Sequence, residues 1–544
     1  MRWRLGGVER MEAMTLTASI PEQWSTRLET LEFRHGVGYE VECRPDALRE
    51  LCNWIADTLG YAFAGLIVEQ AAHEWELRYL FHATELPGWV HVIVRAGRAY
   101  GRLPSISDLI HAADWPEREA EDLFGLIFEG HPRLGDFVLH DDVWQEGVAP
   151  MRKEFDALAR AIARAPNTNW RPDRIVHAPG AFGMPVGPVY SGAAESAHFL
   201  LETVGEDVIR ALPRFFYKYR AVEKIAEGRR AEDALLLAER INGLTAFAHG
   251  LACAQALEAI GGLEPPPRGA TLRVFLAELE RLRHHVGAIQ EICESTALAV
   301  AAAEAGVLEE ELLRLSGALT GHRYLFGLSA CGGLARDLPD AELAATVVRA
   351  RAILERLESL EHRLVRTSSF LDRLEEVGLV TEEEARAFSL VGPIARASGL
   401  VRDLRKAQPY CGYAAFRFDV PMEAEGDGYA RLRVLFAEAR QSLSLMTQAL
   451  DRLPEGPVRV PEAQERSTAM PQKAGAALGW TEAPLGAALH WVRIDERGMI
   501  VRYRIIPPSF VNWHAFYLAA EAFAFQDFPI ILATFGLSVS ENDR

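Results

Sequence analysis

The spacing of apolar residues divides the sequence into two parts with different periodicities. Over 65–85 and 89–98, apolar and polar side chains alternate and many are β-branched or aromatic, which is typical of strands. A helical pattern follows at Ser105–Ala113. Residues 1–155 are therefore predicted to form a small α/β domain.

After a predicted linker at 156–179, the pattern changes to that of long amphipathic helices. The Gly- and Pro-rich stretch 180–192 predicts a short opening strand. Apolar residues at intervals of three to four then predict helices over Ala231–Ile260, Ala270–Ala303, Ala341–Leu374 and Ala430–Leu453.

Near the C-terminus, alternation over 489–495 and 499–506 predicts a hairpin, and a helix is expected around Trp513–Phe525. The predicted fold class is α+β. A small N-terminal α/β domain is followed, over 180–544, by a large, mainly α-helical bundle domain with short β-hairpins.

Composition narrows the classes of partner. The net charge of −18 argues against nucleic acid, because phosphate binding needs a cationic surface. No apolar run reaches the roughly 18 residues that span a bilayer, and residues 1–14 lack the apolar core of a signal peptide. The six cysteines form no CxxC pair and are expected to be buried small hydrophobes.

One stretch of the first part carries a specific motif. Residues 114–134, DWPEREAEDLFGLIFEGHPRL, followed by Arg152, closely resemble the signature of the small α/β (30 kDa-like) subunit of the complex I peripheral arm. Glu117, Arg118, Asp122 and Arg152 are expected to form a charged network that fixes a subunit interface. The alternative is a surface helix with local ion pairs that contribute little.

From about Gly187 to its last residue, the second part resembles the large subunit of membrane-bound, energy-converting [NiFe] hydrogenases of the formate hydrogenlyase type. It equally resembles the 49 kDa-like homologue in complex I. The matching blocks occur in the family's order at 187–199, 214–227, 279–287, 319–327, 392–410, 425–443 and 507–513. Fusion of the two subunits in this order, as in the C/D-type subunit of NADH-quinone oxidoreductase, is recurrent in such complexes.

The family's metal ligands are missing. A hydrogenase large subunit holds nickel and iron with four thiolates from two CxxC motifs, because soft sulfur suits these metals. The matching positions are Asn242, Thr245, Ser538 and Glu541. Amide, hydroxyl and carboxylate groups do not replace thiolates at such a centre. The sequence therefore predicts no metal bound by this chain and no hydrogenase activity.

In complex I, the corresponding cavity binds a quinone headgroup, and the residues expected for that site also differ here. The quinone-binding tyrosine falls at Gly243, and the histidine of the opening strand falls near Tyr190 or Ser191. The acidic partner falls at Ser295, with Glu294 beside it. The usual pair that protonates a quinone is therefore absent.

Other residues are candidates for the same chemistry. Tyr190 and His198 are candidate donors to an acceptor carbonyl, and Glu195 and Glu223 are candidate proton relays. The alternative is that Tyr190 packs and that His198 is a structural histidine.

Further family positions imply support for the cavity. Arg396, Asp403 and Arg405 match residues that line or support it, although structural ion pairs have the same appearance in a sequence. Leu485 stands where the family usually has arginine, which removes a cation from the region of the neighbouring cluster.

Two functions from different classes follow from the resemblance. The first is a subunit that forms a quinone-like acceptor cavity beside a partner's [4Fe-4S] cluster and couples redox chemistry to ion translocation. The second is a non-redox scaffold that docks partners and transmits conformational strain. Both imply a small [4Fe-4S] subunit, a ferredoxin-like subunit and membrane-embedded ion-translocating subunits as partners. Both also imply a cytoplasmic location, peripheral on the cytoplasmic face of the inner membrane through partner subunits. No nucleotide-binding motif is present.

Overall fold

The computed structural model describes residues 27–34, 37–83, 88–98, 101–141, 144, 147–156, 174, 176–190, 195–461, 474–521 and 523–544. The chain forms two compact units, Met1–Trp170 and Arg171–Arg544. Most of the predicted linker 156–179 and the N-terminal residues 1–26 lie outside the described residues. Within the described ranges, none of the helices combines the length and the apolar character needed to cross a bilayer.

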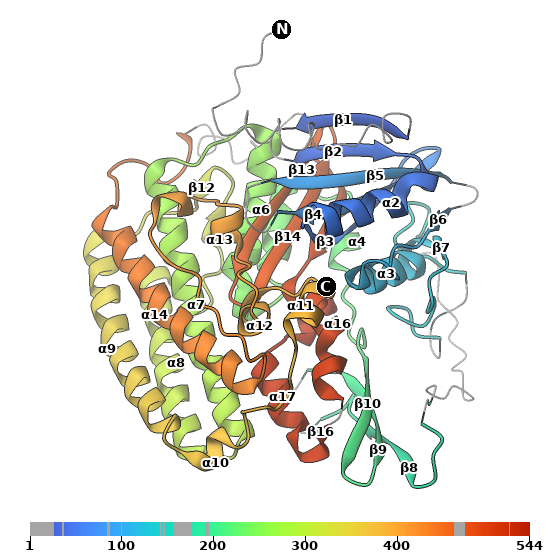
Figure 1. Cartoon of the computed structure of the whole chain (residues 1–544). Helices are drawn as coiled ribbons and strands as arrows, with labels where there is room; N and C mark the ends of the chain where they lie inside the picture. Colours follow the sequence, from blue (N-terminus) through green and yellow to red (C-terminus); the bar gives the residue numbers. More distant parts are fainter. Residues whose placement is uncertain are drawn as a thin grey trace. The chain divides into compact units, whose positions relative to one another are not determined.

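The first unit is built on a five-stranded sheet (Figure 1) in the order β1-β2-β5-β4-β3. Its strands are β1 (Leu28–Arg34), β2 (Gly38–Cys43), β3 (Ala62–Gln70), β4 (Glu74–His82) and β5 (Trp89–Gly97). The strands predicted over 65–85 and 89–98 are thus confirmed. The sheet packs against α2 (Leu48–Asn53) and α3 (Asp114–Phe124).

The helix predicted at Ser105–Ala113 is wrong, because the α-helix begins at Asp114 and only a short 3₁₀ turn precedes it. The Ser105 hydroxyl donates to Glu117 at 2.5 Å and accepts the Ser107 N–H at 3.1 Å. These side-chain bonds offer the backbone an alternative to helical bonds. The true helix, α3, ends at Gly125, whose φ of 69° suits glycine.

The four charged residues expected to form a network, Glu117, Arg118, Asp122 and Arg152, bond to backbone groups around α3. Asp122 accepts the N–H groups of residues 137–139, and Glu117 accepts that of residue 106. Arg118 donates to the carbonyls of residues 135 and 136, and Arg152 to those of residues 124 and 125. The motif therefore ties the loops around α3 to the helix.

The second unit contains a bundle of long helices that lie side by side in Figure 1. They are α7 (Pro267–Ser295), α8 (Ala299–Thr320), α9 (Asp340–Leu364) and α14 (Gly428–Asp451). Pro267 at the start of α7 and the Asp427 side chain, which caps α14 by accepting the Ala430 N–H at 2.7 Å, set where these helices begin.

Three of the predicted long helices are each interrupted. Residues Ala231–Ile260 form α5 (Ala231–Ala238) and α6 (Ala246–Gly261), because Asn242 is extended and its side chain accepts the Leu244 N–H. The stretch Ala270–Ala303 is divided between α7 and α8 at Ala297, which has a positive φ of 63°. The predicted helix Ala341–Leu374 likewise contains α9 and the short α10 (Ser368–Leu371).

Two sheets accompany the bundle. The predicted C-terminal hairpin is confirmed as β14 (Gly486–Ile494) and β15 (Ile500–Ile506), and β13 (Gly475–Ala483) adds a third strand to it. Small residues let β13 approach α6 closely, since a Cβ at Gly479 would overlap the Ala252 carbonyl.

A second sheet, in the order β16-β10-β9-β8, contains β8 (Ala181–Val186), β9 (His198–Val204), β10 (Asp207–Arg214) and β16 (Phe523–Ala524). The C-terminal segment includes α16 (Pro508–Ala520), α17 (Phe528–Phe535) and α18 (Val539–Asn542). The opening strand and the C-terminal helix predicted from the sequence are therefore present.

Candidate functional site

The four positions at which the family resemblance expects metal ligands come together at the end of the chain. Asn242 and Thr245 lie in the turn between α5 and α6, and Glu541 lies in α18. Glu541 Oε1 accepts hydrogen bonds from Asn242 Nδ2 at 3.0 Å and from Thr245 Oγ1 at 2.8 Å. Ser538 caps α18, because its hydroxyl accepts the Glu541 N–H at 3.3 Å.

Further donors surround the Glu541 carboxylate. His249 Nε2 lies 3.4 Å from Oε1, and the Ser509 N–H donates to Oε2 at 3.2 Å. Burial raises the pKa of this fully buried carboxyl, but the hydrogen bonds from His249, Ser509 and Asn242 outweigh that effect and bring it to about 2. The site is therefore a buried anion surrounded by hydrogen-bond donors.

A line of hydrogen bonds runs inward from this carboxylate. His249 Nδ1 lies 2.9 Å from His490 Nε2, and His490 Nδ1 lies 2.7 Å from the Tyr503 hydroxyl. Burial, and then His249, hold the pKa of His490 well below its usual range, so this ring is neutral. The carboxylate only accepts, so His249 Nε2 is the donor to Glu541, and one further hydrogen bond joins His249 Nδ1 to His490 Nε2. The anion thus orients the His249 ring at the start of the line.

Neither the motifs nor the periodicity of the sequence predicted a role for these three residues. His249 lies on the first turn of α6, four residues after Thr245, which is the N-cap of that helix. His490 and Tyr503 lie on β14 and β15 at buried positions of the alternating pattern. The signal available in the sequence was that His490 and Tyr503 are polar residues at positions of the predicted hairpin where the alternating pattern expects apolar ones.

A nickel–iron centre does not fit these residues. The site offers one carboxylate, whose oxygens already accept four hydrogen bonds, together with amide and hydroxyl groups, and no thiolate. Across the described residues, no group of three or more His, Cys, Asp or Glu side chains has metal-binding geometry. All six cysteines are free thiols; five are buried and Cys411 is partly buried.

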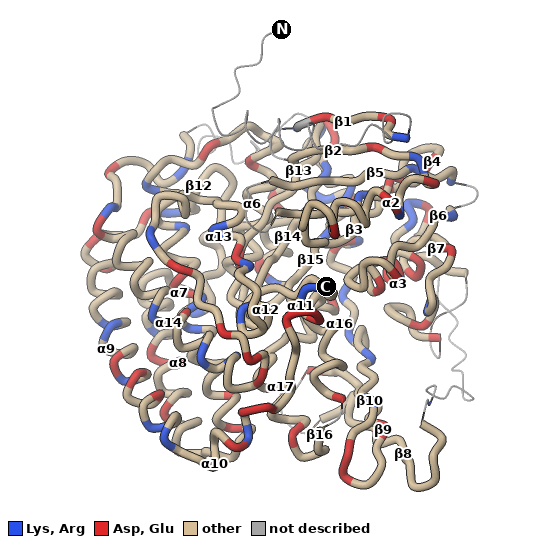
Figure 2. The backbone as a smooth tube through the Cα atoms, viewed as in Figure 1, with Lys and Arg blue, Asp and Glu red and all other residues tan. Residues whose placement is uncertain are grey.

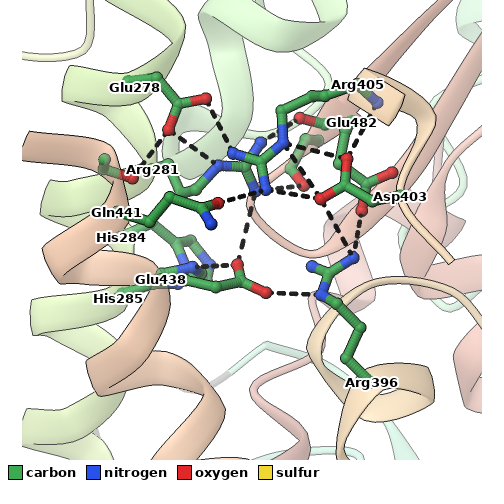
Figure 3. A network of polar contacts seen from close by, with 12 residues as sticks. Glu278, Arg281, His284, His285, Arg396, Asp403, Arg405, Glu438, Gln441 and Glu482 are labelled. Carbon is green, nitrogen blue, oxygen red and sulfur yellow. Dashed lines mark hydrogen bonds and ion pairs between the residues drawn. The ribbon is translucent and has the colours of Figure 1, made fainter. Parts of the chain in front are cut away.

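A second polar cluster, which we call the bundle network, lies between α7, α14 and β13 (Figure 3). It contains Glu278, Arg281, His284, His285, Arg396, Asp403, Arg405, Glu438, Gln441 and Glu482. Three of the predicted cavity residues, Arg396, Asp403 and Arg405, belong to it. The structure therefore brings these three together, within the interior of the unit.

Guanidinium groups join the carboxylates of the bundle network. Arg396 donates to Glu438 at 2.5 Å and to Glu482 at 2.8 Å. Arg405 pairs with Asp403 at 2.6 Å. Burial raises the pKa of Asp403, but the Arg405 guanidinium outweighs burial and lowers this pKa below its usual range. Ion pairs that link several elements in this way are costly to break by removing one partner.

Glu223, the predicted proton relay on α4 (Val222–Ala226), lies in a separate charged cluster. Its carboxylate pairs with Arg502 at 3.0 Å, and with Arg504 and Arg544 at 3.2 Å. Burial raises its pKa, but Arg504, Arg502 and Arg544 outweigh burial and lower it to about 2. This cluster fixes the C-terminal arginine to α4 and β15.

The other predicted residues of the acceptor site lie along the segment before β9. The Tyr190 hydroxyl donates to the Ala197 carbonyl at 2.8 Å. His198, at the start of β9, is partly buried, and burial followed by Arg214 lowers its pKa. Glu195 accepts from the Ser538 hydroxyl at 3.3 Å, so it reaches one of the former ligand positions.

A small cavity lies beside the bundle network. Its walls include His284, Arg431, Thr534 and Leu485, the residue that replaces the family's arginine. At about 20 Å³ it has room for one water molecule but not for a quinone headgroup.

Both units match models of known families. Residues 41–161 match "Respiratory-chain NADH dehydrogenase, 30 Kd subunit", and residues 306–544 match "Respiratory-chain NADH dehydrogenase, 49 Kd subunit". The order of the two matches is that predicted from the motifs.

Relatives span both units. Formate hydrogenlyase subunit 5 of Escherichia coli (strain K12) is 31% identical over 84% of this chain and 79% of its own length. The fused C/D-type subunit of NADH-quinone oxidoreductase from Acinetobacter baylyi is 29% identical over 81% of this chain and 80% of its own length. A chain from a solved membrane-bound sulfane sulfur reductase, an archaeal respiratory membrane complex, is 26% identical with a TM-score of 0.63. That alignment covers 67% of this chain and 99% of the other.

Proposed function

The chain belongs to the family of the fused 30 kDa and 49 kDa subunits of respiratory-chain NADH dehydrogenase and their hydrogenase relatives, and on that premise we propose a role in a membrane-associated oxidoreductase complex. In this role it forms an electron-acceptor cavity beside a [4Fe-4S] cluster carried by a small partner subunit. It couples electron transfer to ion translocation by membrane-embedded partners, and it has no hydrogenase activity.

The observation that carries the proposal is the Glu541 carboxylate at the former ligand positions. The turn that presents Asn242 and Thr245 also exposes part of Leu244, which is 37% exposed, so Glu541 lies directly behind a surface segment. A hydrogen-bonded anion thus stands where the resemblance to hydrogenases places metal ligands. Without thiolates the chain does not hold the nickel and iron that react with hydrogen. The fold that positions partners and an acceptor is kept.

The remaining parts of the proposal follow from the family. The other partner is a ferredoxin-like subunit, and the complex lies on the cytoplasmic face of the membrane, to which this chain is held by its partners. The acceptor that we propose is quinone-like. Tyr190, His198 and Glu195 stay candidates for contact with it, while Tyr190 is already bonded to a backbone carbonyl.

Electron paramagnetic resonance on the purified complex tests the acceptor. We expect the signal of the nearest [4Fe-4S] cluster to shift when a quinone analogue is added, and the complex to reduce quinone. No shift together with no quinone reduction would favour the non-redox scaffold. Polysulfide is tested as a second acceptor. Reduction of polysulfide but not of quinone would indicate a site similar to that of the sulfane sulfur reductase.

Metal analysis of the same sample tests the absence of hydrogenase chemistry. We expect no stoichiometric nickel and no hydrogen uptake, because the four former ligand positions supply no thiolate. Nickel at one atom per chain would contradict the proposal.

A further inference from the structure

Arg431, in the first turn of α14, is a buried cation that bonds to neutral groups. The residue is 1% exposed. Its Nη1 donates to the Gly426 carbonyl at 2.9 Å, and its Nη2 donates to the Gly378 carbonyl at 2.9 Å and to the Thr534 hydroxyl at 3.1 Å. Within the described part of the chain, no Asp or Glu forms an ion pair with it. The fold therefore fixes this guanidinium in place without giving it a counterion.

The carboxylates around Arg431 are engaged elsewhere. Asp427 is the acidic residue whose charge acts on Arg431, but both of its oxygens accept backbone N–H groups. The carboxylates of the bundle network pair with Arg396 and Arg405 instead. Burial consequently lowers the pKa of Arg431 to about 9. A buried charge without a paired counterion is unfavourable, so this position favours the binding of an anion.

The small cavity gives an anion access to the guanidinium. Arg431 lines this cavity where α7, α14 and α17 meet, and its buried Nε has no hydrogen-bond partner among the described residues. Burial holds the pKa of His284, another wall residue, well below its usual range, so its ring is neutral. Among the described residues of the walls none is acidic, and Arg431 alone is charged. The cavity thus presents a positive charge and one free donor.

The size and the walls of the cavity decide the class of anion. A volume of about 20 Å³ holds one group of the size of a water molecule, and sulfate and phosphate are too large for it. Apolar side chains, including Leu435, Leu485 and Phe535, form much of the wall. In such surroundings the attraction between an anion and the guanidinium is stronger than in water. The Phe535 ring also lies 4.6 Å from the guanidinium carbon, which helps to hold the side chain in position.

We propose that this cavity is a binding site for one monatomic halide ion, chloride in the cell, held by Nε of Arg431. The ion supplies the counterion of the buried guanidinium, and it joins α14 to the walls formed by α7 and α17. A hydrogen bond between two charged groups is stronger than the bond that a water molecule would make at the same place. The site is independent of the proposed function, because it needs neither an acceptor nor a partner subunit.

Bromide is the probe, because it resembles chloride and scatters X-rays anomalously. Crystals of the full chain soaked in sodium bromide should show one anomalous peak in the cavity beside Arg431. Density without an anomalous peak would identify a water molecule and overturn the proposal.

In solution, thermal unfolding of the full chain is followed while sodium bromide replaces sodium gluconate at constant ionic strength. We expect the midpoint to rise and then to saturate, as it does when a ligand binds the folded state alone. An anomalous peak with no saturable rise would mean binding at crystal concentration only, and it would also overturn the proposal.

Two variants of the cavity make the test specific. Arg431→Gln removes the cation and should weaken bromide binding about 10- to 100-fold, the loss expected for a hydrogen bond to a charged group. Ala288→Val fills the cavity from α7 and leaves Arg431 in place, and it should abolish the saturable rise. If Arg431→Gln does not fold, Ala288→Val decides alone.

Arg402→Gln is the matched control. Arg402 is also a buried arginine, it donates to the Leu390 carbonyl, and burial lowers its pKa to about 10, but it does not line the cavity. This variant should keep the saturable rise of the wild type. A rise that persists in Ala288→Val, or that is lost in Arg402→Gln, would place the ion elsewhere and overturn the assignment to Arg431.

Discussion

Glu223 and Glu541 are two carboxylates of the same unit that reach the same ionisation state in different ways. Both are fully buried, and the pKa of each is about 2. The charge of Glu223 is balanced by three guanidiniums, whereas that of Glu541 is stabilised by amide, hydroxyl, imidazole and backbone donors. Figure 2 shows that charged residues of both signs are also distributed along the bundle helices.

The difference lies in what remains when the carboxylate is removed. Around Glu223, three buried guanidiniums would lose the carboxylate that they share, and breaking a buried ion pair by removing one partner is among the most destabilising changes in a protein. Around Glu541, amide, hydroxyl and backbone donors and one imidazole would lose an acceptor, which costs less than removing the anion shared by three guanidiniums. A site held mainly by dipolar donors is therefore expected to tolerate a change of its central group better than a site held by three guanidiniums.

The largest effect is expected for Glu223→Gln. Loss of the negative charge breaks the buried ion pairs with Arg502, Arg504 and Arg544, and we expect a loss of about 3–5 kcal/mol in the free energy of unfolding. Chemical denaturation of the purified protein measures it. The exposed Glu375→Gln is the control and should change stability little. A loss at Glu223 no larger than at Glu375 would contradict the role of the three cations.

Acidification should act on both sites. A carboxylate whose pKa is lowered on folding contributes stability above its unfolded value and loses it as the pH falls towards the folded value. For Glu223 and Glu541, that window extends from about 4.5 down to about 2, and the shift corresponds to about 3 kcal/mol for each group. Stability measured between pH 5 and pH 3 should therefore fall less steeply in either Gln variant than in the wild type. Identical slopes would show that these groups titrate normally.

Glu541→Gln is expected to have a smaller effect on stability, about 1–3 kcal/mol, because glutamine still offers one acceptor oxygen to Asn242 and Thr245. The same denaturation experiment measures it beside Glu223→Gln. If Glu541→Gln costs as much as Glu223→Gln, then a carboxylate bound by three guanidiniums is no harder to replace than one bound by amide, hydroxyl, imidazole and backbone donors. Glu541→Ala, which leaves every donor unsatisfied, should be worse than Glu541→Gln.

Periodicity predicted the long helices and the C-terminal hairpin, because these elements bury apolar faces with a regular spacing. It missed the breaks at Asn242 and Ala297, where a side-chain hydrogen bond and a positive φ act locally. Arg396 was predicted from its motif. Its partners Glu438 and Glu482 lie 42 and 86 residues further along the chain, and no spacing rule relates side chains that meet only through the packing of separate elements.

The smallest effect is expected at Tyr190, where the two alternatives from the sequence were a donor to the acceptor and a packed side chain. Its hydroxyl donates to the Ala197 carbonyl at 2.8 Å, which commits the proton to the backbone before β9. Tyr190→Phe should therefore cost about 1 kcal/mol of stability and leave turnover of the complex unchanged. His198→Ala, measured beside it, reports on the neighbouring candidate donor. A fall in turnover for Tyr190→Phe with unchanged stability would assign the hydroxyl to the acceptor, and would show that the region before β9 changes its hydrogen bonds when the acceptor binds.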